Sequence, residues 1–119
     1  MNKILLTLNS PNLNNHTYTT EVIEKALKDS ENFRYLERVM NFDGVVNLEN
    51  VIGKITNIRV EKNSLIGDVE LSKDLCSDDV VQLIKNDVLA IRPYGIGELD
   101  KGQVYDYQLV GFAITNDPA

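Results

Sequence analysis

Two strand-like stretches joined by a short turn constrain the fold of this chain more than any other feature. From residue 65 to residue 71, apolar or small residues alternate with polar ones, which is the period-2 pattern of a half-buried strand. The stretch 50–60 mixes apolar positions with β-branched residues, and Lys62-Asn63 between the two stretches favours a tight turn. The sequence therefore predicts a β-hairpin, and with it an antiparallel sheet.

Two helices are predicted from capping residues and apolar faces. Thr19 or Thr20 can cap a helix over residues 21–28, and Ser77 can cap a second one over residues 78–86. Both segments carry acidic residues in the first turn, where the positive end of the helix dipole stabilises them. Four apolar residues of the second helix are expected to face inward: Val80, Val81, Leu83 and Ile84.

Strands are also expected at residues 3–8, 88–97 and 103–115, where short apolar runs end in turn-forming residues. Residues 33–45 are predicted to form a short helical turn followed by a loop, because four apolar residues have helical spacing: Phe33, Leu36, Val39 and Met40. The expected fold class is α+β: a strand-rich, partly closed β-barrel with two short helices packed on it.

Length and charge limit what such a fold can do. With 119 residues and 43% hydrophobic content, residues 1–119 are expected to form one domain with a modest core. Twelve basic and eighteen acidic residues give a net charge of -6, so nucleic acid is not expected as a direct partner. The single cysteine excludes an internal disulfide, and the sequence has neither a leader pattern nor an apolar span of membrane length. We therefore expect no membrane partner and assembly in the cytosol.

Several short motifs together resemble one family. Four of them occur in the order found in the prohead maturation proteases of tailed bacteriophages. They are Asn12-Leu13-Asn14 with Tyr18, the strand start Val46-Asn47-Leu48, Leu83-Ile84-Lys85, and Gly95-Ile96-Gly97. The closing Asn116-Asp117-Pro118 is similar as well. The resemblance spans nearly the whole chain and implies a prohead-protease-like fold.

The resemblance also locates the positions of the catalytic groups. A serine protease needs a hydroxyl that a nearby base, normally histidine, makes nucleophilic. The family's serine positions fall on Arg92 and Pro93, and its histidine position falls on about Phe42. His16, the sole histidine, stands where the family usually has arginine. We therefore expect a catalytically degenerate homologue that has no catalytic residue and is not an enzyme.

Other reactive residues have simpler interpretations. Cys76 is expected to be a packed thiol, and His16 a turn residue with a local hydrogen bond. Asp78 and Asp79 stabilise a helix start, because neighbouring residues on a helix point in different directions. The glycines around Ile96 lack the lysine and hydroxyl residue of a phosphate-binding loop. No cofactor and no metal site are expected.

A degenerate protease on a retained fold would be used for binding. We therefore expect a non-catalytic capsid auxiliary or decoration protein that binds the major capsid protein and other virion proteins. Its expected location is the virion capsid, assembled in the cytoplasm of the bacterial host. Two alternatives remain open: an active serine maturation protease, and a regulator or inhibitor of capsid maturation.

The expected binding surface centres on Arg92 and Tyr94, because Arg and Tyr are enriched at the energetic centres of interfaces. The N-terminal motif is a second candidate, through three of its residues: Asn12, Asn14 and Tyr18. An alternative for the first pair also remains open. In it, Tyr94 packs in the core and Arg92 pairs with a local acid such as Glu98.

Overall fold

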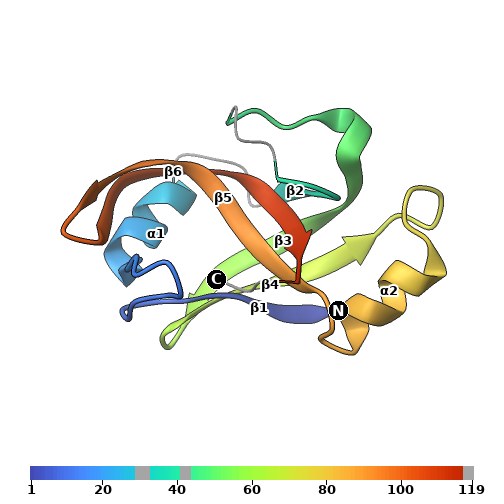
Figure 1. The fold of residues 1–119 in the computed structure, drawn as a ribbon, viewed down its shortest axis with the longest axis horizontal. Helices are drawn as coiled ribbons and strands as arrows, with labels where there is room; N and C mark the ends of the chain where they lie inside the picture. Colours follow the sequence, from blue (N-terminus) through green and yellow to red (C-terminus); the bar gives the residue numbers. More distant parts are fainter. Residues whose placement is uncertain (29–32, 41–43, 117–119) are drawn as a thin grey trace.

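A six-stranded sheet, curled into a half-barrel, forms the body of the protein (Figure 1). The computed structural model describes residues 1–28, 33–40 and 44–116. The strand order in the sheet is β1-β4-β3-β2-β6-β5, so β1 and β5 are the two edge strands. The elements are β1 (Asn2–Thr7), α1 (Thr20–Lys28), β2 (Phe33–Glu37), η1 (Leu48–Asn50), β3 (Val51–Glu61), β4 (Ser64–Leu71), α2 (Asp78–Lys85), β5 (Ala90–Asp100) and β6 (Gln103–Thr115).

The predicted hairpin is confirmed as β3 and β4. The two strands pair antiparallel from Gly53 and Leu71 to Glu61 and Ser64. Lys62 in the turn has a φ of 54°, in the left-handed region that tight hairpin turns require. Leu65 and Val69 face the core, as the alternation predicted.

Both helices begin at the predicted caps. The Thr19 side chain accepts a hydrogen bond from the Val22 amide at 3.2 Å, and the Ser77 side chain accepts one from the Val80 amide at 3.4 Å. One detail of the second helix is wrong: Ile84 is fully buried, but Leu83 remains 39% exposed. An eight-residue helix at the end of the sheet buries only a narrow stripe, and Leu83 lies beside it.

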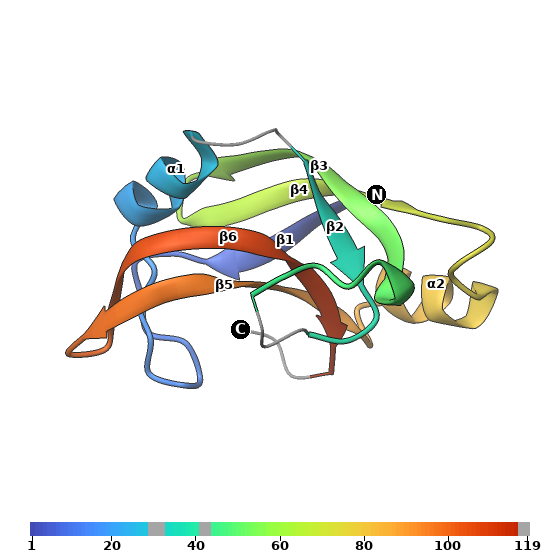
Figure 2. The same ribbon diagram turned by 90° about the horizontal axis from the view of Figure 1, so that it is seen from above.

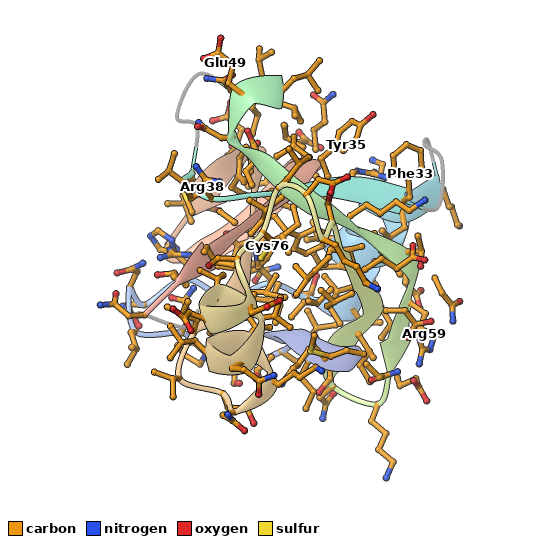
Figure 3. All side chains as sticks on the ribbon, turned by 90° about the vertical axis from the view of Figure 1, so that its right-hand side faces the viewer. Phe33, Tyr35, Arg38, Glu49, Arg59 and Cys76 are labelled. Atoms are coloured by element: carbon orange, nitrogen blue, oxygen red, sulfur yellow. The ribbon has the colours of Figure 1, made fainter. Side chains whose placement is uncertain are left out.

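The prediction of a helical turn at residues 33–45 is wrong, because Phe33–Glu37 forms strand β2. It pairs antiparallel with β3, and at Leu36 and Glu37 it pairs in parallel with β6. Figure 3 shows Phe33 and Tyr35 on the same side of the strand, and their rings meet edge to face at 5.6 Å. Hydrogen bonds from two neighbouring strands outweigh a helical spacing of apolar residues, because so short a helix is marginal in isolation.

The core lies inside the curl of the sheet. Leu36, Ile55 and Phe112, from three adjacent strands, are each fully buried. Helix α1 packs on the sheet through Ile23, and α2 closes the opposite end through Ile84 (Figures 1 and 2). The α+β class, the strand-rich curled sheet and the two short helices are confirmed.

Candidate functional site

Strand β5 is an edge strand that stays regular along its whole length. Its register with β6 shifts twice, after Tyr94 and after Ile96, and both shifts place the additional residue in β6. Residues 95–100 of β5 are all exposed. Natural edge strands are usually protected by bulges of their own, so a regular and exposed edge is a potential binding surface for another chain.

A buried polar network lies behind the middle of β5. The Tyr94 hydroxyl donates a hydrogen bond to the Glu37 carboxylate, and the Asn47 main-chain amide donates to its other oxygen at 2.8 Å. Glu37 is fully buried, and Tyr94 is only 6% exposed. Burial raises the pKa of Glu37, and the hydrogen bond from Asn47 opposes this rise. The network joins β2, β5 and the segment that precedes η1.

The segment before η1 passes close to the exposed part of β5. Gly44 has a φ of 71°, and a Cβ added to it would lie 2.7 Å from the side chain of Ile96. The positive φ favours glycine here, because other residues rarely adopt it, whereas the exposed Ile96 side chain could shift to make room for a Cβ. Phe42, at the position implied for the histidine, lies outside the described residues.

Arg92 is a half-buried cation at the inner end of β5. The described residues give it no ion pair, so the alternative in which Arg92 pairs with a local acid such as Glu98 finds no support among them. Burial raises the pKa of Tyr18 and of Tyr107, and the positive charge of Arg92 opposes the rise in both. A guanidinium without an acidic partner beside an open edge can bind an incoming carboxylate.

Tyr18 and Tyr107 form an aromatic pair, with ring centroids 5.3 Å apart and planes at 79°. Among the described side chains, the buried Tyr107 hydroxyl has no hydrogen-bond partner. A Cβ added to Gly95 would lie 2.8 Å from this hydroxyl, so the ring packs directly against β5. The predicted residue Tyr18 is therefore a packing partner of the sheet.

The other predicted residues of the N-terminal motif shape a loop. The Asn12 side chain accepts hydrogen bonds from the amides of Asn14 and His16 at 3.0 and 2.9 Å. Leu13 projects from this loop and is 79% exposed. The predicted residues thus fall in two places: Arg92, Tyr94 and Tyr18 around β5, and Asn12 and Asn14 in the loop. Cys76 is buried as predicted, and Figure 3 labels it beside α2.

Three buried polar residues near β5 were not among the predicted site residues: Glu37, Arg34 and Tyr107. Glu37 and Arg34 are the two buried charged residues among those described. The Arg34 guanidinium donates a hydrogen bond to the Leu109 carbonyl at 3.0 Å. The available signal was two charged residues in a short segment, 33–37, whose other three residues are aromatic or apolar; a helical interpretation places these charges at the surface.

The comparison with solved structures gives one informative neighbour. The fold is similar to that of the bacteriophage T4 capsid assembly protease, gp21. The TM-score is 0.73 at 20% sequence identity, and the match covers 96% of this chain and 79% of that chain. No family profile and no curated protein matches the sequence. At this identity the likeness is one of fold alone, and it supports the prohead-protease-like architecture.

This comparison contradicts the expectation that the chain is not an enzyme, because the similar structure is that of a protease. That expectation rested on three positions, Phe42, Arg92 and Pro93. The residues at those positions exclude only the serine–histidine pair that the resemblance implies there. Hydrolysis by residues elsewhere on the fold stays open.

Two further findings concern the described residues. None of their His, Cys, Asp and Glu side chains form a group of three that could hold a metal ion. No helix among them is long and apolar enough to cross a membrane.

Proposed function

We propose that this protein acts in the assembly of a tailed-phage capsid and binds an extended segment of the major capsid protein along the free edge of β5. The observation that carries the proposal is the regular, exposed edge at residues 95–100, on a fold similar to a capsid assembly protease. An extended peptide adds to such an edge through main-chain hydrogen bonds, and neighbouring side chains supply specificity.

Side chains on and beside β5 supply contacts for such a segment. Ile96 is 54% exposed and Leu99 is 51% exposed, so both can bury apolar surface against a bound chain. Arg92, which has no acidic partner among the described residues, can pair with a carboxylate of the same segment. The buried Tyr94 makes no contact of this kind, but its hydrogen bond to Glu37 anchors β5 to β2.

Binding can be measured with overlapping fluorescent peptides from the major capsid protein of the same phage. Ile96→Asp and Leu99→Asp should each weaken the tightest peptide roughly ten-fold or more, because each removes apolar burial and adds a charge. Ile4→Asp is the matched control, since Ile4 is a 65% exposed isoleucine on the opposite edge strand β1. Equal binding by all three variants and the parent would refute the β5 surface.

Hydrolysis of the bound segment is the second candidate function, and the similarity to a protease favours it. The purified chain would be incubated with the capsid protein precursor, and new termini identified by mass spectrometry. Discrete cleavage products, together with fluorophosphonate labelling of a serine, would establish the activity and locate its nucleophile. An intact precursor that nevertheless binds β5 would leave assembly binding as the function.

A further inference from the structure

Pro93 determines which main-chain groups of β5 face its free edge. It lies inside the strand, opposite Phe112 of β6. Proline has no N–H, so a strand accepts it where that group would point away from the paired strand. Successive residues of a strand direct their N–H and carbonyl groups to opposite sides, and β5 is regular because both additional residues are in β6. Gly95, Gly97 and Leu99 therefore direct their main-chain groups to the free edge.

These edge groups are available to another chain. Within the described part of the protein, no main-chain hydrogen bond outside the β5–β6 pair involves any of the three residues. Two of the three are glycines, so no side chain of their own limits the approach of a second main chain.

The side chains of this half of β5 divide into two faces. A Cβ at either glycine would meet the Tyr107 ring, so the odd-numbered residues face the core side. The Ile96 side chain lies on the opposite, outer face, where it reaches Gly44. Glu98 and Asp100 follow Ile96 on that face, because side chains alternate along a strand. Both are exposed, and neither forms an ion pair among the described residues.

A hollow of about 240 Å³ lies beside Asp100 at the tip of the β5–β6 hairpin. Figures 1 and 2 show this tip extending past α1. The hollow is lined by Asp100, Gln103 and Tyr105. The carboxylate and the amide oxygen can accept hydrogen bonds, and the tyrosine ring can pack against a cationic side chain. This lining suits a lysine or arginine.

We propose that the outer half of β5 selects an extended segment with two basic residues at alternate positions, one beside Glu98 and one beside Asp100. The basic residue beside Asp100 extends into the hollow. The residue between the two is apolar, since it points to the core side, where Leu99 is 51% exposed. This inference rests on the function proposed for β5 and specifies the chemistry of the segment that binds there.

Two acetylated and amidated peptides of one composition test the alternation. They are Thr-Val-Lys-Val-Lys-Val-Thr and Thr-Val-Val-Lys-Lys-Val-Thr, each with the same fluorescent label. The full chain should bind the first roughly three-fold or more tightly in fluorescence anisotropy, because adjacent lysines point to opposite faces of a strand. Equal affinity, a preference for the second peptide, or no binding of either would overturn the proposal.

Amide hydrogen exchange, followed residue by residue by NMR, tests the position of the bound peptide. With the alternating peptide, exchange at Gly95, Gly97 and Leu99 should slow roughly ten-fold or more, because their amides gain acceptors. The amides of Ile96 and Glu98 face β6 and should change less. Binding without slower exchange at the three edge amides would contradict docking along β5.

Charge-neutral variants test the two carboxylates. The double variant Glu98→Gln with Asp100→Asn should bind the alternating peptide roughly five-fold more weakly. The matched control is Glu24→Gln with Asp74→Asn, which removes the same charge from exposed positions on α1 and in the loop before α2. It should bind as the parent does. An equal loss in both double variants would show a general charge effect and would refute the selection by β5.

The capsid peptides separate this inference from the function on which it rests. If Ile96→Asp weakens the tightest capsid peptide but the Glu98 and Asp100 double variant does not, the alternating-charge inference is wrong and binding of capsid protein at β5 stands. If the alternating peptide docks on β5 and no capsid peptide does, the inference stands and the proposed capsid partner is wrong.

Discussion

Replacing Tyr94 with phenylalanine tests whether the buried network at Glu37 stabilises the fold. The ring remains in place, and only the hydroxyl that donates to the carboxylate is lost. Glu37 is fully buried, so the oxygen that loses its donor cannot turn to water. Its other oxygen keeps the hydrogen bond from the Asn47 amide at 2.8 Å.

The expected loss is about 2 kcal/mol in the free energy of unfolding, the usual contribution of a hydrogen bond to a charged, buried group. For a chain of this length, that loss corresponds to a fall of about 8 °C in the midpoint of thermal unfolding. Urea denaturation gives the free energy, and scanning calorimetry gives the midpoint.

The pH dependence provides a separate check. Burial raises the folded-state pKa of Glu37 above its ordinary value of 4.5. The protonated Glu37 carboxyl therefore contributes its full stability below pH 4.5, its ordinary pKa. This contribution is lost as pH rises through the folded-state pKa. The Tyr94 hydroxyl favours the ionised form, so Tyr94→Phe should cost more at about pH 8 than at about pH 5.

Tyr105→Phe is the matched control, because Tyr105 is 42% exposed and makes no hydrogen bond through its hydroxyl among the described residues. It should change the free energy of unfolding by less than about 0.5 kcal/mol. If Tyr94→Phe also changes it by less than that, or costs more at low pH, the proposed role of the network is wrong.

Two further substitutions test the packing of β5 on β6. Gly95→Ala should destabilise the fold by about 2 kcal/mol, since the new Cβ would lie 2.1 Å from the Gln108 carbonyl oxygen. Gly97→Ala, where the nearest atom is 3.1 Å away on a side chain, should cost about 1 kcal/mol or less; equal costs in urea denaturation would contradict the packing argument. Tyr107→Phe should leave stability unchanged or raise it by about 1 kcal/mol, because the removed hydroxyl is buried without a partner among the described residues. A clear loss of stability in calorimetry would show that this hydroxyl forms a stabilising contact.

The sequence by itself determined the elements whose causes are local. The hairpin of β3 and β4 follows from alternation over neighbouring residues and from the turn at Lys62. The starts of both helices follow from Thr19 and Ser77. Their side-chain oxygens accept hydrogen bonds from the main-chain amides three residues further along the chain. Patterns of this kind can be recognised in a single sequence, because every interacting group lies within a few positions.

The tertiary structure decided the features that depend on distant partners. Residues 33–37 become strand β2 only because β3 and β6 are on either side, and no local pattern specifies the neighbour at Phe112. Glu37 is buried because Tyr94, 57 positions away, supplies a hydrogen bond. Arg34 is buried because the carbonyl of Leu109, 75 positions away, accepts one. Burial of a charge requires a partner that the sequence does not place nearby, and only the folded sheet brings the two together.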